Sequence, residues 1–477
     1  MPVPDVMKRF ISACLALASV CLARAPVNGA RPEYGGTLRV EIEATIRSAD
    51  PAAPANGAAE AGARQRALGL VFETLVAAEA DGLRPVLATS WENDPRGARW
   101  QFRLRSGVRL HDGSLLEAWQ VATALRVSEP AWTIASEADT IVINTGEPVR
   151  DLPWTLADLR HAVVVRGSGG ALTGTGPFAI ERLEPARLSL RAHDGYWAGR
   201  PFVDAVRIEM GRSPAGQLGD LEGGRADIVS ATPLDARRLA QRGLRVAASH
   251  PLEVVALVFE AHRSSDAALA VRRTLAAAVN RTSMCAVLLQ RLAEPAEALV
   301  PRWLSGYAPL FILDPKATLS RAAIAALPLD QRELTVRIDA SNALAQAIAD
   351  RVAVDGREAG FTIKVQAPAG LAPRPDARVI RAHVPVTSPD RALVAAAGRL
   401  SARDAAKPAV AILPPAPSLD AVYQAEQKLL DRSIIVPLVH LPEIYGLGDR
   451  VGTWNAAPVR PSGGWNFADV WLRGGKP

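Results

Sequence analysis

Polar and hydrophobic residues alternate in several short stretches of the chain, which is the pattern of a strand with one buried face. The clearest alternations lie at residues 37–43, 100–104, 206–210, 334–338 and 361–365. A continuous apolar run at 254–259 instead indicates a strand that is covered on both faces. The chain therefore contains strands of two kinds, some half-buried and at least one central.

Other stretches carry hydrophobic residues three and four positions apart, which predicts helices. Residues 68–75 and 271–279 follow this spacing. Ser114 and Glu117 form a capping-box pattern ahead of a further helix. A helical stretch at 344–352 lies between two alternating stretches, which predicts a β-α-β unit. No repeat of fixed period occurs, so the pattern favours a mixed α/β fold over a solenoid.

The N-terminal segment has the features of a secretory signal. Lys8 and Arg9 precede an apolar run at 10–23, and small residues follow as far as Ala30. A run of this length is short for a membrane span. We therefore expect residues 1–30 to be a signal peptide that is removed on export, with an uncleaved membrane anchor as the alternative. Either alternative places the rest of the chain outside the cytoplasm, in the periplasm.

Composition narrows the class of protein. The 477 residues are 49% hydrophobic and 22% charged, as in ordinary globular chains, which excludes intrinsic disorder and a protein with many membrane spans. The length corresponds to about three domains of ordinary size. The net charge of +6 is spread along the chain without a run of Lys and Arg, so we expect no nucleic-acid partner.

Motifs for catalysis or metal binding are missing from the sequence. No nucleophile elbow or P-loop frame occurs, and Pro177 breaks the glycine-rich stretch 174–176 as a dinucleotide fingerprint. The seven histidines have no spacing typical of a zinc site. Cys285 is the single cysteine beyond the predicted signal, so it cannot form an internal disulfide, and it fits a buried structural thiol better than a nucleophile. We expect no catalytic residue, no cofactor and no metal.

Short blocks of sequence occur in an order that resembles one known family. They are GGTLRV (35–40) with ADP (49–51), FETLV (72–76) with PVLATSW (85–91), WQFRLRSGVRLHDG (100–113), GTGPF (174–178), HDGYW (193–197), and GGRADI (223–228) with RRTLA (272–276) and NR (280–281). Together they resemble the family 5 extracellular solute-binding proteins of ABC transporters, which take up oligopeptides, dipeptides, nickel complexes and some sugars. The resemblance covers about residues 35–300 and, more loosely, 425–472.

The resemblance implies an α/β fold of the two-lobed periplasmic-binding-protein type, class II, with an extra subdomain in the first lobe. It places the first lobe at 36–58, 168–250 and 443–477, the extra subdomain at 59–167 and the second lobe at 251–442. A protein of this kind captures a peptide-like or other small solute between its lobes and delivers it to the membrane permease of an ABC transporter. We expect such a protein to be monomeric and to act without catalysis.

The sequence departs from the peptide-binding members of the family in its second lobe. Those members carry a Trp and an Asp that holds the amino group of the peptide, whereas residues 379–399 contain no Trp and no Asp that aligns. Asn280 also stands where the family usually has Asp before Arg281. The identity of the ligand therefore stays open. The alternatives are a periplasmic sensor, receptor or enzyme on the same fold, or a degenerate member that binds no ligand.

Candidate ligand contacts are expected at strand ends and returning segments that face the space between the lobes. The candidates are Thr45, Arg47, Glu260, Arg381, His383 and Trp465. An arginine in such a place could pair bidentately with a carboxylate or a phosphate, although a solvated surface position is its ordinary role. We assign plainer roles to His111, in a turn, and to Trp100 and Phe102, in a core.

Overall fold

The computed structural model describes residues 31–79, 82–149, 151–307, 318–338, 343–367, 374–400, 417–452, 454 and 463–474. The predicted signal peptide, residues 1–30, lies outside the described residues. Across the ranges that are described, no helix is both long enough and apolar enough to span a membrane.

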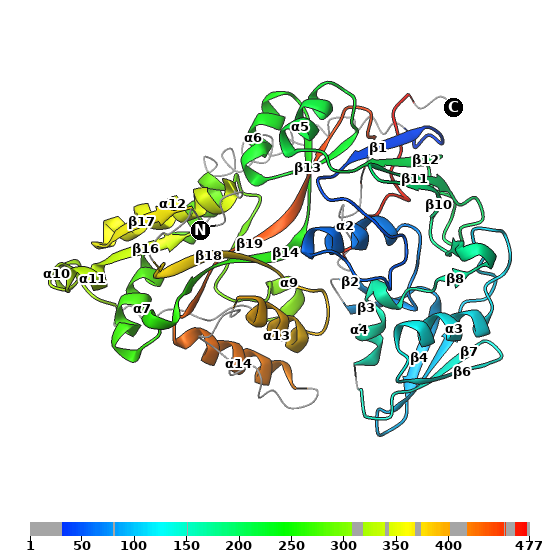
Figure 1. Ribbon diagram of the computed structural model, residues 1–477, viewed down its shortest axis with the longest axis horizontal. Helices are drawn as coiled ribbons and strands as arrows, with labels where there is room; N and C mark the ends of the chain where they lie inside the picture. The colour runs from blue at the N-terminus through cyan, green and yellow to red at the C-terminus, as the bar shows by residue number, and fades with distance from the viewer. Residues whose placement is uncertain are drawn as a thin grey trace, which may run out of the picture.

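One large mixed sheet runs through both halves of the molecule (Figure 1). In the described parts of the chain it has eleven strands, in the order β10-β11-β12-β1-β13-β19-β14-β18-β16-β17, with β15 paired to β19. The strands are β1 (Thr37–Glu41), β10 (Phe178–Glu184), β11 (Arg187–Ala192), β12 (Ala205–Glu209), β13 (Ile228–Ala231), β14 (Arg245–Phe259), β15 (Glu294–Pro295), β16 (Glu333–Arg337), β17 (Thr362–Gln366), β18 (Ala377–His383) and β19 (Ile435–Leu447).

Two long strands, β14 and β19, occupy the centre of this sheet and are shared by both halves (Figure 1). They pair with each other in antiparallel fashion, while β19 also pairs with β13 and β14 also pairs with β18. Their pairing is irregular between Ala248 and Glu253, where Pro251 lies opposite Pro442. The half with β1 and β10–β13 is called the first lobe below, and the half with β15–β18 the second lobe. The lobe boundaries expected from the sequence stay a prediction.

A subdomain extends from the first lobe. It contains the sheet β4 (Ala88–Asn93), β5 (Arg99–Leu104), β7 (Thr140–Asn144) and β6 (Thr133–Glu137), the pair β2 (Val76–Glu79) and β3 (Gly82–Pro85), the pair β8 (Val165–Arg166) and β9 (Leu172–Thr173), and the helices α3 (Ala118–Ser128) and α4 (Leu152–Leu156). Trp100 and Phe102 are buried in its hydrophobic core, as expected from their alternation.

Helices cover the sheet in both lobes (Figure 1). The first lobe has α2 (Ala58–Leu68), α5 (Pro214–Glu222) and α6 (Pro233–Gln241). The second lobe has α7 (Leu269–Ala278), α8 (Arg281–Ser283), α9 (Arg302–Ser305), α10 (Arg321–Ala325), α11 (Leu329–Arg332), α12 (Ala343–Ala359), α13 (Pro389–Leu400) and α14 (Leu419–Asp431). Short 3-10 turns are η1 (Leu159–His161), η2 (Ser168–Gly170), η3 (Ala261–Arg263) and η4 (Asp266–Ala268), and η5 (Met284–Leu288) is a π-helical turn.

The apolar run at 254–259 confirms its prediction. Val255 and Leu257 belong to a core with residues of α7 and α12, whereas Val254 and Ala256 belong to a core with residues of α13 and α14. This part of β14 is therefore covered on both faces, which explains why its sequence has no polar alternation. The mixed α/β architecture and the two-lobed fold that the sequence predicted are both observed.

Two local predictions are wrong. The helix expected over 68–75 is wrong because α2 ends at Leu68, and the buried residues that follow Gly69 form turns and an extended segment. The capping box of α3 uses Glu117 and Gln120, whose Oε1 accepts the Glu117 N–H at 2.8 Å. Ser114 takes no part in this cap, since its hydroxyl donates to Asp112 Oδ1 at 2.6 Å within the preceding turn.

Candidate functional site

Two carboxylates lie in the strands that join the lobes, each within an otherwise apolar run. Glu253 is on β14 and Glu443 is on β19. Glu443 accepts hydrogen bonds from Arg66 Nη1 and from the Tyr445 hydroxyl, both at 2.6 Å. Its own backbone N–H donates to Ser249 Oγ at 2.9 Å. Each oxygen of the Glu443 carboxylate thus accepts a hydrogen bond, and the side chain is only 18% exposed.

Arg66 reaches Glu443 from the last turn of α2 in the first lobe. Tyr445 is buried beside this ion pair, and burial raises the pKa of its hydroxyl well above the usual value. Trp465 supports both groups from behind: its indole Nε1 donates to the Tyr445 hydroxyl at 3.0 Å, and its backbone N–H donates to the Arg66 carbonyl at 3.2 Å. Trp465 itself is only 1% exposed, so it positions the pair and cannot itself form a cleft wall.

The second lobe contributes Arg381 and His383 from β18. The Arg381 guanidinium donates a hydrogen bond to the Glu253 carboxylate, and the two side chains form an ion pair. The Arg381 side chain is 40% exposed. His383 lies directly opposite Glu253 in the strand pairing, so the two side chains share one face of the sheet. We refer to Arg66, Glu253, Arg381, Glu443 and Tyr445 together as the cleft floor.

The His383 ring is neutral at neutral pH. Burial, followed by the positive charges of Arg399, Arg66 and Arg381, lowers the pKa of His383 to about 4, while Glu443 opposes the shift. The residue nevertheless keeps a large solvent-accessible surface. The charges that act on it come from both lobes, so His383 lies near their junction.

The cleft floor carries equal numbers of positive and negative groups. Each arginine is paired with a carboxylate of its own, and a tyrosine hydroxyl and a neutral imidazole lie beside them. Such a set can offer donors to a carboxylate and acceptors to an ammonium or hydroxyl group. The chemistry therefore suits a small polar or zwitterionic solute.

The structure brings together three of the six residues singled out from the sequence. Arg381 and His383 meet Glu253 and Glu443 at the cleft floor, and Trp465 lies directly behind it. Arg66, Glu253, Glu443 and Tyr445 were missed. Two of these residues, Glu253 and Glu443, could have been identified because each is a carboxylate within a mostly apolar strand, at residues 251–259 and 435–447.

The other three predicted residues lie elsewhere. Glu260 forms an ion pair with Arg378 at the far end of β14, about 23 Å along the strand from Glu253. The Arg47 side chain is exposed and reaches Glu60 near the start of α2, about 9 Å along that helix from Arg66. Thr45 is half-buried in the loop before Arg47. Within the described residues, no hydrogen bond or ion pair joins any of the three to the cleft floor, and their role in binding stays a prediction.

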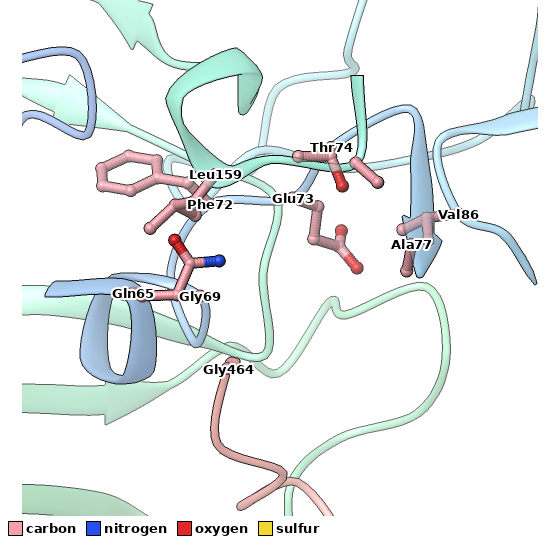
Figure 2. Close-up of a pocket in the computed structure, with 10 residues that line it drawn as sticks. Gln65, Gly69, Phe72, Glu73, Thr74, Ala77, Val86, Leu159 and Gly464 are labelled. Carbon is pink, nitrogen blue, oxygen red and sulfur yellow. The ribbon is translucent and has the colours of Figure 1, made fainter. Parts of the chain in front are cut away.

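A small pocket lies on the first-lobe side of the molecule, between α2, the subdomain and the C-terminal segment (Figure 2). Its volume is about 40 Å³, room for water and not for a peptide. Figure 2 draws Glu73 and Gln65 among its lining side chains. Glu73 accepts hydrogen bonds from Tyr196, Trp197 and Thr175 at 2.9–3.0 Å, so this carboxylate ties the subdomain to the first lobe.

Among the residues that the structure describes, no group of three or more His, Cys, Asp or Glu side chains is arranged so that it could hold a metal ion. Cys285 is buried, and burial raises the pKa of its thiol to about 12. His111 bridges two backbone segments, accepting from the Gly174 N–H at 3.2 Å and lying 3.1 Å from the Gly176 carbonyl. These residues have structural roles.

Comparison with known proteins decides the family. Residues 82–379 match the model of the bacterial extracellular solute-binding proteins, family 5 (middle region), over more than half of the chain. This chain belongs to that family. The sequence-based assignment is confirmed.

Individual relatives agree with this assignment. The chain is 24% identical over 292 residues to the peptide transport periplasmic protein SapA of Salmonella typhimurium LT2, covering 49% of this chain and 53% of that protein. Matches to the curated relatives span between 24% and 53% of those proteins' own length.

Two solved structures show the same fold. NikA from Brucella suis, in complex with Fe(III)-EDTA, aligns with a TM-score of 0.73 at 18% identity, covering 92% of this chain and all of that one. The murein tripeptide-binding protein MppA, in its unliganded open form, aligns with a TM-score of 0.69 at 17% identity, covering 92% and 98%. At these identities the likeness establishes the two-lobed fold.

Proposed function

We propose that this family 5 member captures a small polar solute on the cleft floor and delivers it to the membrane permease of an ABC transporter. The observation that carries the proposal is the convergence of Arg66 and Glu443 from the first lobe with Glu253 and Arg381 from the second. Charged groups from two lobes that meet at their junction form a site that is complete when the lobes come together. Family membership supports the same function.

The motion that accompanies binding is a rotation of one lobe about β14 and β19. Irregular pairing near Pro251 and Pro442 leaves few ladder hydrogen bonds to break there. The residue limits we propose for the lobes, 36–58, 168–250 and 443–477 against 251–442, with 59–167 as the subdomain, place the hinge at these prolines. MppA was solved in an open, unliganded form, which supports two lobe arrangements for this fold.

The ligand class is argued from the cleft floor and from the relatives. SapA is named as a peptide transport protein, and a nickel-binding periplasmic protein of Escherichia coli K12 is also similar, at 25% identity over 251 residues. The balanced charges of the cleft floor favour a zwitterion such as a short peptide. We propose that the chain acts as a monomer in the periplasm after loss of residues 1–30, without catalysis and without a nucleic-acid partner.

The test is thermal unfolding of the chain with di- and oligopeptides, nickel chelates, oligosaccharides and opines. A ligand at about 100 times its Kd adds about 2.7 kcal/mol to the folded state, which gives a measurable rise in Tm. The expected result is a rise with one class of solute and recovery of that solute unchanged. Chemical turnover of the solute would support the enzyme alternative.

Two further outcomes separate the remaining alternatives. Binding without any stimulation of transport by a permease would support a sensor or receptor. A flat panel with a cooperatively folded chain would support the degenerate member that binds no ligand. Either result would overturn the transport proposal.

A further inference from the structure

A short segment of the second lobe extends onto the first. Residues 384–391, called the interlobe strap below, connect β18 to the first turn of α13. At its start, the Val384 N–H donates to the Leu252 carbonyl at 2.8 Å, beside the irregular part of β14. Two residues later, Val386 packs against both the core of the first lobe and the core of the subdomain. The strap therefore makes apolar contact across the junction.

The strap ends in a polar lock. Arg391 donates from Nη2 to Asp151 Oδ1 at 2.8 Å, and its Nε lies 2.8 Å from Oδ2 of the same carboxylate. Arg391 Nη1 donates to Thr155 Oγ1 at 2.5 Å, and the Ser388 hydroxyl lies 3.3 Å from Asp151 Oδ2. Asp151 and Thr155 belong to the start and body of α4 in the subdomain. A fork of guanidinium nitrogens on one carboxylate fixes orientation as well as distance.

These contacts join parts of the molecule that the hinge separates. In Figure 1, α13 lies beside α9 and above α14 of the second lobe, whereas α4 lies beside α3 and the strands of the subdomain. Arg391 and Asp151 are 240 residues apart in the sequence. Rotation of one lobe about β14 and β19 would therefore separate them, so the lock exists only in the closed arrangement.

The strap also lies in the region where the peptide-binding members carry their anchoring stretch, residues 379–399. This chain lacks that Trp and Asp, and it uses Ser388 and Arg391 to hold the opposite lobe.

We propose that the interlobe strap holds the lobes closed in the absence of ligand, with the Arg391–Asp151 pair as its lock. The inference rests on the hinge motion of the proposed function. Its consequence follows from population arithmetic: when the closed, binding-competent state is already populated, little affinity is lost in closing the lobes. Breaking the lock lowers the closed population and raises the apparent Kd by the same factor.

The test measures the distance between the lobes in the ligand-free chain. Spin labels are placed on exposed positions, Glu92→Cys in the subdomain and Gln427→Cys in α14, with Cys14 and Cys21 replaced by serine. Cys285 does not interfere, because it is buried and its thiol pKa is raised to about 12. Double electron–electron resonance then reports the distribution of lobe separations. The unmodified lock predicts one short distance.

Arg391→Ala is expected to add a longer distance and to lower the closed-to-open ratio about fivefold, the effect of a half-exposed ion pair with hydrogen bonds. Asp151→Asn keeps the side-chain shape and should act in the same direction, as should raising the salt concentration. Exchanging the charges, Asp151→Arg with Arg391→Asp, should restore the short distance. Arg103→Ala, which breaks an exposed ion pair within the subdomain, is the matched control and should change nothing.

The proposal would be overturned if the ligand-free chain with its native Arg391 and Asp151 already showed the longer lobe separation. It would also be overturned if Arg391→Ala and Asp151→Asn left the distribution of separations unchanged. Circular dichroism of each variant identifies a failure to fold, and in that case the charge-exchange variant tests whether the ion pair sets the separation. The distance readout needs no ligand, so it separates the two proposals. If the distances respond to the substitutions as expected but no solute raises Tm, the proposed function alone is contradicted. If a solute raises Tm but the distances do not respond to the substitutions, the role of the interlobe strap alone is contradicted.

Discussion

The cleft floor and the interlobe strap both join the two lobes, and they differ in how far they exclude water. The Arg66 and Glu443 side chains are 23% and 18% exposed and lie against the buried Tyr445, whereas Arg391 and Asp151 are 40% and 28% exposed. Removing one partner from a mostly buried pair leaves a charge with little access to water, while water readily replaces the lost partner of a more exposed pair. The cleft floor is thus part of the folded architecture, and the strap can open and close.

The largest expected effect is on the cleft floor. Glu443→Ala removes the acceptor of both Arg66 and the Tyr445 hydroxyl, so we expect the free energy of unfolding to fall by about 3 kcal/mol. Urea denaturation measures it. Glu222→Ala, which breaks the pair with the exposed Arg238, is the control and should cost less than about 1 kcal/mol. If both variants lost the same free energy of unfolding, the ion pair at the cleft floor would be no more important for folding than a surface ion pair.

The loss of folding stability at low pH should be larger for the buried His161 than for the more exposed His383. Burial lowers the pKa of His161 to about 3, and Arg160 donates to its Nε2 at 2.9 Å, a bond that protonation would break. In the unfolded chain the imidazole titrates near its ordinary pKa, about 6.5. As the pH falls from about 6.5 towards 3, the unfolded state takes up a proton that the folded state does not, so stability decreases.

We expect His161→Gln to reduce this acid-induced loss by about 2 kcal/mol at pH 4.5, measured by urea denaturation at stepped pH. His383→Gln is the comparison, because the pKa of His383 is lowered to about 4 but its ring keeps contact with solvent. Its effect should be smaller. An equal effect of both variants would mean that the surroundings of His383 exclude water as fully as the protein interior around His161 does.

Arg381→Ala should affect binding more than folding. The arginine is 40% exposed, so its loss should lower the free energy of unfolding by no more than about 1 kcal/mol. It belongs to the proposed binding site, and we expect the Kd for the panel solute with the largest Tm rise to increase about tenfold or more, measured by calorimetric titration. A variant with unchanged Kd would remove Arg381 from the site.

A small effect on folding is also expected at the strap. Arg391→Ala should lower the free energy of unfolding by no more than about 1 kcal/mol, which matches the fivefold change in the closed-to-open ratio, while it alters the lobe separation described above. Denaturation of this variant alongside Glu443→Ala gives the comparison directly. A loss of about 3 kcal/mol for Arg391→Ala would place the strap with the permanent architecture and contradict its role as a lock.

Much of the fold was accessible from the sequence because its signals are local. Alternating and continuous apolar runs depend on neighbours within one strand, and they located β1, β5 and the central part of β14. The helix predicted over 68–75 was wrong because Leu70, Val71, Phe72 and Leu75 are buried from several directions, which copies a helical spacing without a helix.

The site was less accessible because its pairs are distant in the sequence. Arg66 and Glu443 are 377 residues apart, and no spacing rule connects them. Arg381, His383 and Trp465 became candidates through the segments in which they lie, whereas no feature of the sequence singled out Arg66. The lock of Arg391 on Asp151 was equally invisible, since an ion pair across a hinge leaves no periodic trace in either segment.

The most direct test of a solute held on the cleft floor is hydrogen–deuterium exchange with and without the panel solute that gives the largest Tm rise. The account predicts that protection increases at residues 249–253, 381–391 and 440–445, which come from both lobes and meet only at their junction. Protection confined to one lobe, or centred near Glu260 or Arg47 with no change at β14 and β19, would contradict it.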